Sequence, residues 1–207
     1  MFDSKRILDQ LVGSGFAGGL AGGAAGAALV NALSGKKARK YAGTALKAGG
    51  LALVGGLAYK AWQQYQGGRA DDSQPAPSAF VPPTPQESKP LSLLLVKAMI
   101  AAARSDGNID SEEQQSIMSR ISELNLDDAE KAYLFEQFAM PVDIQALADG
   151  ADTPEHAAEI YAASSLMLNQ PSLSERHYLD KLAHALRLDM GLRAEIDRAV
   201  HEQQAAA

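Results

Sequence analysis

Three carboxylates in the second half of the chain are the side chains best placed to do chemistry: Asp106, Asp110 and Glu113. Carboxylate oxygens are the ligands that Ca²⁺ and Mg²⁺ prefer, and a turn between helices could bring several of them together. The spacing is not that of an EF-hand. Counting from Asp106 puts Ser111 at the glycine position and Ile117 at the position of the bidentate glutamate. A divalent cation is nevertheless one ligand that this acidic turn could hold.

Two other interpretations of the acidic turn need no metal. Asp106-Gly107 is typical of a turn, and Asp110 with Glu113 three residues later is typical of a capping box at a helix start. The same carboxylates could also contact a protein partner. The sequence alone leaves these alternatives open.

A second polar group consists of His177, Asp180 and His184, which share one face of a predicted helix. Histidines seven residues apart are two helical turns, or ~10 Å, from each other, so both cannot easily ligate one ion. We therefore expect these side chains to be solvated or to have polar partners within the protein. His156 and His201 indicate no further site.

The chain contains no recognisable catalytic arrangement. It has no cysteine, no nucleophile elbow, no phosphate-binding glycine loop and no zinc-protease helix. The N-terminal glycines are not a dinucleotide fingerprint, because no strand precedes them and no βαβ unit follows. We therefore expect a protein that is not an enzyme.

Two ladders of small residues, each with a period of four, run through the first thirty positions. No charged residue occurs between Leu11 and Gly35, and 15 of these 25 residues are Gly or Ala. Each glycine costs a helix in water about 1 kcal/mol relative to alanine, whereas a bilayer enforces helical hydrogen bonding. The ladders predict a membrane helix whose smooth face packs on another helix; a flexible leader is the alternative. The glycines assigned to this packing are Gly15, Gly18, Gly19, Gly22, Gly23 and Gly26.

A second apolar segment runs from Tyr41 to about Trp62 and follows a basic loop at 36–40. Aromatic residues at both ends are typical of a membrane interface, and Tyr41 to Tyr59 would span about 27 Å as a helix. Beyond Lys47, however, the uncharged run is only twelve residues long, which is too short to cross a bilayer. We expect this segment either to cross the membrane or to lie in the interface.

Composition divides the chain into three regions. Residues 1–65 form the Gly/Ala-rich membrane-associated segment, in one or two helices. Residues 66–90 hold six of the nine prolines and are predicted to be an extended or disordered linker. Residues 91–207 form an acidic domain, and the stretch 89–207 carries 20 acidic and 10 basic side chains, a net charge of −10. Lysines and arginines in the first region suit anionic lipids, and the acidic domain argues against nucleic acid as a partner.

From residue 91 onward the hydrophobic pattern is helical throughout, which predicts an all-α bundle. The helix at 91–102 is apolar on most sides and is expected at the centre. Asp127 is predicted to start a helix that ends before Pro141, and Thr153-Pro154 to start another. Further helices are expected near 111–124, 144–147, 174–187 and 190–203.

The acidic domain also shows an internal similarity at an offset of 62 residues. Ile117 corresponds to Leu179, and Asp127 corresponds to Asp189. Two helical halves related by a pseudo-twofold axis would explain this pattern, whereas chance similarity between amphipathic helices is the alternative.

The segment from Ala101 to Glu113 resembles the signature of the TerB-like domains, which are named for tellurite-resistance proteins. It combines an apolar helix, Asp106-Gly107, a hydrophobic residue and a capped acidic helix start. The order of regions is similar to that of the YebE-type inner-membrane proteins, whose function is unassigned. The resemblance implies an all-α domain with acidic turns and a role in stress or metal response. The second half departs from the pattern, since Asn169 stands where the first half has Asp106.

Together these features predict a membrane-anchored helical adaptor in the bacterial inner (cytoplasmic) membrane. The N-terminal segment would insert among lipids and associate into a homo-oligomer, and the linker would present the acidic domain to an unidentified protein partner. The alternative function is a divalent-cation-responsive domain with its site at Asp106, Asp110 and Glu113. Which side of the membrane holds the domain depends on the number of spans.

Overall fold

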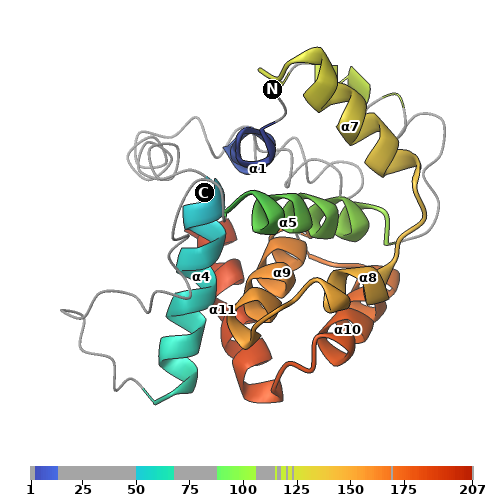
Figure 1. Ribbon diagram of the computed structural model, residues 1–207. Coiled ribbons are helices and arrows are strands. Elements are labelled where there is room, and N and C mark those ends of the chain that lie inside the picture. The colour runs from blue at the N-terminus through green and yellow to red at the C-terminus, as the bar shows by residue number, and fades with distance from the viewer. Residues whose placement is uncertain are drawn as a thin grey trace.

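The computed structural model describes residues 3–13, 50–67, 88–105, 115, 118–119, 121–122, 124–168 and 170–206. Within these residues the chain forms eight helices and no strand, so the prediction of an all-α fold is confirmed (Figure 1). The helices are α1 (Ser4–Gly13), α4 (Gly50–Tyr65), α5 (Ser88–Ala103), α7 (Asp128–Ala139), α8 (Ile144–Asp149), α9 (Pro154–Met167), α10 (Leu173–Ala185) and α11 (Met190–Ala206).

Side-chain caps define where several of these helices begin. The carboxylate of Asp127 accepts from the amide of Glu130, whose own carboxylate accepts from the amide of Asp127, so α7 starts with a capping box. Thr153 caps α9 with Pro154 in its first turn, and Ser172 caps α10. The predicted starts at Asp127 and Thr153-Pro154 are therefore confirmed, as is the end of α7 before Pro141.

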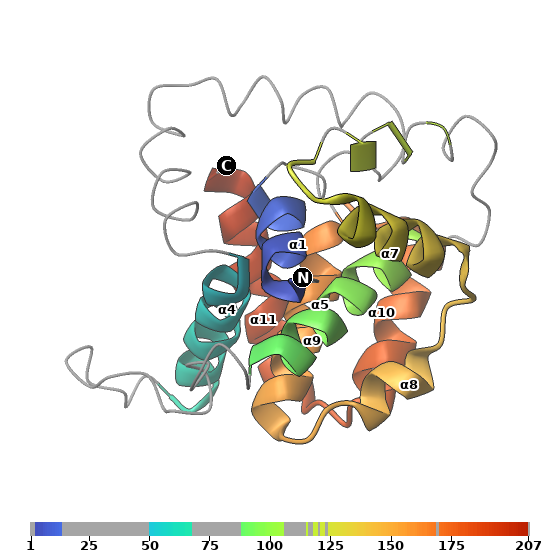
Figure 2. The same cartoon turned by 45° about the horizontal axis from the view of Figure 1, so that its top comes forward.

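The core is built around α5 and α9, which pack against each other. Every residue of α9 from Ala157 to Met167 is buried, and α5 lies between α9 and α1 (Figure 2). The prediction that the helix at 91–102 is central is confirmed, because Leu95, Ala98 and Met99 are fully buried. Small side chains on α9 allow its neighbours to approach closely, so a helix of modest hydrophobicity can fill the centre.

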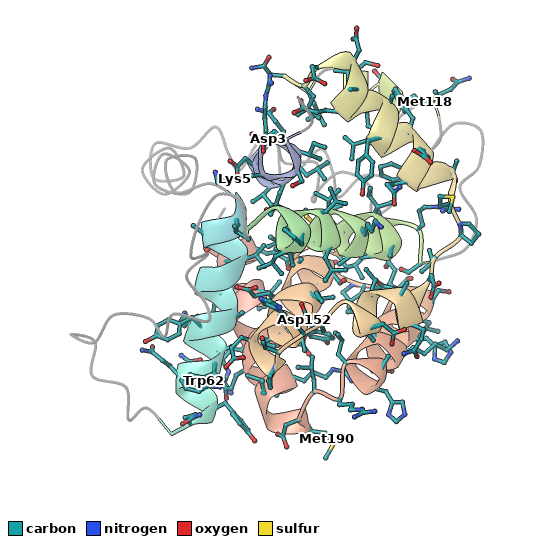
Figure 3. All side chains as sticks on the ribbon, in the orientation of Figure 1. Asp3, Lys5, Trp62, Met118, Asp152 and Met190 are labelled. Carbon is teal, nitrogen blue, oxygen red and sulfur yellow. The ribbon has the colours of Figure 1, made fainter. Side chains whose placement is uncertain are left out.

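α4 packs within the same core as the C-terminal helices. It contacts α11, α9 and α1, and it buries an apolar face that includes Leu51, Val54, Ala58 and Ala61. Trp62, in the lower half of α4 in Figure 3, is partly buried against that core. Part of the segment that sequence analysis assigned to the membrane is thus a core helix, which corrects the expectation of a spanning or interfacial helix there.

The length of α4 is also too small for a membrane span. It is 16 residues long. No helix within the described ranges has both the length and the apolarity needed to cross a bilayer.

α1 is an amphipathic helix that covers α5 and the first residue of α4. Its own apolar side chains Ile7, Leu8 and Leu11 are buried. The carboxylate of Asp9 accepts a hydrogen bond of 2.6 Å from the amide of Gly50. The residues on either side of segment 14–49 therefore meet at one place, which we call the α1–α4 junction.

A buried carboxylate ties α1 to the start of α7. Glu130 is fully buried and lies 3.7 Å from the guanidinium of Arg6, while the amide of Asp3 donates to it over 3.3 Å. Arg6 also donates to the carbonyl of Asn125. Figure 3 labels Asp3, directly before α1, and Lys5 in its first turn. Because Glu130 also closes the capping box, one side chain links helix initiation to tertiary packing.

Several predictions fall outside the described residues. These are the glycine ladders, most of the linker at 66–90 and the acidic turn, so their structural expectations stay predictions. The residues concerned are Gly15, Gly18, Gly19, Gly22, Gly23, Gly26, Asp106, Asp110 and Glu113.

Candidate functional site

A hollow of about 350 Å³ lies where the end of α5, the start of α8 and one face of α10 meet. Its size is at the lower end of the range found for small-molecule sites. We call it the basic hollow. Its lining residues are Arg104, Ser105, Val142, Ile144, Ser174, His177, Tyr178 and Lys181.

The spacing of residues on α10 explains how four of them reach one hollow. Ser174, His177, Tyr178 and Lys181 follow one another at intervals of three, one and three residues, which places them on a single face of a helix. The capping box at Ser172 fixes where this helix begins and thus which face turns toward α5 and α8.

Arg104 reaches the hollow from the turn that ends α5. Its amide donates to the carbonyls of Ile100 and Ala101, which continues the helix by a tight turn. Its guanidinium donates to the carbonyl of Met140, in the connection between α7 and α8. Arg104 therefore links the end of α5 to the connection between α7 and α8, and backbone carbonyls hold it in position.

The hollow has a local basic character within an acidic part of the chain. Arg104, His177 and Lys181 supply cationic or potentially cationic groups, and none forms an ion pair with any residue that the structure describes. The Nε atom of Arg104 is buried and has no hydrogen-bond partner in this same set of residues. Among the residues that the structure describes, no carboxylate lines the hollow, so this part of its wall does not repel an anionic group.

Tyr178 forms part of the apolar wall together with Val142 and Ile144. Burial raises the pKa of Tyr178 to about 12, so its phenol stays protonated and neutral at physiological pH. Its hydroxyl lies 3.4 Å from the hydroxyl of Ser164 in the core. Tyr178 therefore adds a neutral aromatic side chain to the lining, and the hollow combines cationic groups with an apolar wall.

The structure separates the three polar residues of α10 that sequence analysis considered together. His177 lines the basic hollow. The carboxylate of Asp180 lies 2.6 Å from the guanidinium of Arg193 on α11. His184 is exposed in the last turn of α10. They share no common centre, because Asp180 has a cationic partner on a neighbouring helix.

The basic hollow was not predicted as a site from the sequence. Sequence analysis assigned no binding role to Arg104 or Lys181. A weak signal existed, since His177 and Lys181 are four residues apart on one helix face in a domain with a net negative charge. Their proximity to Arg104 is a tertiary feature that spacing cannot reveal.

A partly buried polar network holds α9, α10 and α11 together. The hydroxyl of Tyr161 donates to the carboxylate of Asp197 over 3.0 Å and accepts from Nε of Arg193 over 3.0 Å. Arg193 also pairs with Asp180. Burial and the nearby Asp197 raise the pKa of Tyr161, so it remains a neutral donor. Every member has a partner, which indicates a structural role.

Comparison with known proteins agrees with a helical family of unassigned function. A family model described as a protein of unknown function (DUF533) matches residues 17–200. A relative from Yersinia enterocolitica, described as an uncharacterized protein in the ampR 5′ region, is 29% identical over 110 residues, or 53% of this chain and 79% of the relative. No solved structure matches significantly. Because the family model covers most of its length, the chain belongs to the DUF533 family, which is related to the TerB-like domains.

Proposed function

We propose that this protein is a membrane-associated helical adaptor, similar to the YebE-type proteins, and that its role is binding without catalysis. Residues 14–49 hold it at the bacterial inner membrane, and the packed helices present the basic hollow to a protein partner. The observation that carries this proposal is the placement of two features on opposite flanks of the molecule.

The α1–α4 junction and the basic hollow are far apart in the fold. In both views α4 lies on one flank, while α8 and α10 lie on the other (Figures 1 and 2). Residues 14–49 leave and return at the α4 flank, because Asp9 and Gly50 contact each other there. A protein attached to a membrane through residues 14–49 would thus keep its basic hollow accessible.

The packing of α1 against α5 also restricts how residues 14–49 can be arranged in a membrane. α1 precedes residues 14–49 and packs against α5, which follows them. A single crossing would put α1 and α5 on opposite sides of the bilayer, which is incompatible with their packing. A helical crossing needs about 20 apolar residues, and the basic residues at 36–40 leave room for one at most. We therefore propose that residues 14–49 dip into the membrane and return on the same side. The basic residues at 36–40 would then lie on the same side of the membrane as the folded helices. Because basic residues beside a membrane segment favour the cytoplasm, they would place the folded helices there.

Fractionation with carbonate extraction, combined with protease accessibility of tags at both ends, tests this proposal. We expect the protein to stay in the membrane fraction and both tags to be protected inside intact spheroplasts. A matched control replaces residues 14–49 with a short Gly/Ser linker, which the contact between Asp9 and Gly50 should tolerate. The control is expected to keep its helical circular dichroism and to lose membrane retention. Release of the parent by carbonate, or tags on opposite sides, would contradict the proposal.

A further inference from the structure

We infer that the basic hollow binds a peptide segment of a protein partner through a carboxylate that stands next to an apolar side chain. The inference rests on the proposed adaptor function for the class of partner, but it does not depend on membrane attachment. It is carried by the arrangement of cationic and apolar groups within one hollow of about 350 Å³.

The cationic groups indicate an anionic ligand of defined geometry. The guanidinium of Arg104 is oriented by its hydrogen bond to the carbonyl of Met140, and its buried Nε has no partner among the described residues. A planar guanidinium with free N–H donors matches a carboxylate well. His177 and Lys181 line the same hollow from α10, so a second and a third donor can approach the same anion.

The apolar wall indicates that the ligand is more than a bare oxyanion. Val142, Ile144 and Tyr178 face the hollow beside the cationic groups. A free phosphate would leave this wall in contact with water, whereas an apolar side chain next to a carboxylate would cover it. The composition of the hollow thus favours a ligand with both an anionic and an apolar part.

Exposed apolar residues adjoining the hollow favour a peptide over a small acid. Met140, whose carbonyl accepts from Arg104, is 53% exposed, and Leu173, which precedes the lining residue Ser174, is 82% exposed. A ligand confined to the hollow would leave both side chains in water. A peptide chain that continues past its carboxylate can contact them, and we therefore assign a peptide as the occupant.

Charge complementarity gives this site its selectivity. Residues 89–207 carry 20 acidic and 10 basic side chains, so most of the surface of the acidic domain repels an acidic peptide. The basic hollow is a local exception, since its described lining holds Arg104, His177 and Lys181 and no carboxylate. An acidic peptide is therefore expected to bind at this place on the domain rather than across its whole surface.

The test is a titration of the full chain, in detergent micelles, followed by NMR of the Val142 and Ile144 methyl groups. The probe is the blocked pentapeptide Gly-Leu-Asp-Leu-Gly, and its neutral control has Asn in place of Asp. We expect saturable methyl shifts with the acidic peptide and at least about tenfold weaker binding of the neutral one. Equal binding of the two peptides, or no shift with either, would overturn the inference.

Two further arms separate the possible sources of the anion. Inorganic phosphate and N-acetyl-leucine are titrated in the same way, and both are expected to bind more weakly than the acidic peptide. If phosphate binds as well as the peptide, the site takes a simple oxyanion and the inference is wrong. If N-acetyl-leucine matches the peptide, the occupant is a small organic acid and the assignment of a peptide is wrong.

A charge-neutralising variant localises the binding. Lys181 is exposed and makes no ion pair with the described residues, so Lys181→Gln should fold normally and weaken peptide binding several-fold. Lys97→Gln, an exposed lysine on α5 that does not line the hollow, is the matched control and should leave binding unchanged. Equal losses in the two variants would show nonspecific attraction and would count against the inference. This titration contains no lipid membrane. A negative result would therefore count against the peptide site and would leave the conclusion on membrane attachment unaffected.

Discussion

The amide of Gly50, the first residue of α4, donates a hydrogen bond of 2.6 Å to the Oδ1 atom of Asp9 in α1. At the same position the backbone of α1 lies so close that a Cβ on Gly50 would be 2.8 Å from the carbonyl oxygen of Leu8. One pair of residues therefore joins two helices that are separated by 36 residues of glycine-rich and basic sequence. Both partners of this contact can be tested by substitution.

Replacing Gly50 with alanine should destabilise the protein. The new methyl group would overlap the backbone of Leu8, which cannot move without displacing α1. We expect a loss of about 1–3 kcal/mol in the free energy of unfolding, measured by urea denaturation.

Gly56 on the same helix provides the matched control for that substitution. It is exposed, and a Cβ there would have no neighbour within 4 Å. Gly56→Ala should therefore stabilise the protein by about 0.5–1 kcal/mol, because alanine loses less conformational entropy in a helix. A stabilising Gly50→Ala would show that α1 and α4 are not in this close contact.

Removing the carboxylate of Asp9 should also weaken the α1–α4 junction. Asp9→Ala leaves the amide of Gly50, in the first turn of α4, without its charged acceptor. We expect a cost of about 1–2 kcal/mol in urea denaturation. Lys5→Ala removes only the exposed ion pair between Lys5 and Asp9 and should cost less than about 0.5 kcal/mol. Similar effects of the two variants would show that the ion pair, rather than the amide contact, stabilises the junction.

Glu159 should make the stability of the protein depend on pH. Its side chain is 2% exposed on α9, and burial together with the charge of Glu155 raises its pKa from 4.5 to about 8. Between these values the folded protein keeps a proton that the unfolded chain releases. Stability from this group is therefore complete below pH about 4.5 and is lost as the pH rises through about 8, by roughly 1 kcal/mol per pH unit.

Glu159→Gln isolates this effect because glutamine keeps the shape and does not titrate. Urea denaturation between pH 5 and pH 9 should show a smaller decline for the variant, which should exceed the parent in stability at the alkaline end. Glu155→Gln should make the decline smaller and end it at a lower pH, since it removes the neighbouring charge that raises the pKa of Glu159 in the folded protein. Identical pH profiles for the parent and Glu159→Gln would contradict the assignment.

Loss of the Tyr161 hydroxyl should destabilise the contact between α9 and α11. Tyr161→Phe removes a donor to Asp197 and an acceptor from Arg193. Both partners are left partly buried, and we expect a cost of about 1–3 kcal/mol in thermal or urea denaturation. Arg198→Gln breaks an exposed ion pair with Glu195 and should change stability by less than about 0.5 kcal/mol. A Tyr161→Phe variant as stable as the parent would mean that the network contributes little.

Helix starts were the feature that sequence predicted best. A cap is a local arrangement, in which Asp127 and Glu130 or Thr153 and Pro154 satisfy amides within one turn. Such contacts need no information from elsewhere in the chain, so spacing alone predicts them. The same reasoning located the helix at 91–102 in the core, because a helix that is apolar on most sides must be covered.

The basic hollow and the packing of α4 required the tertiary structure. A stretch such as Gly50–Tyr65 is compatible with either a lipid or a protein interior, since both are apolar and both accept small residues at close contacts. Only its contacts with α9 and α11 distinguish the two. Arg104 and Lys181 likewise lie 77 positions apart in the sequence, and the crossing of α5 and α10 decides that they line one hollow. The sequence by itself thus determined the helical fold of the acidic domain and the capped starts of α7 and α9, because caps depend on neighbours within one turn. The tertiary structure alone decided which faces meet, because the contacts of a side chain depend on which distant element packs against it.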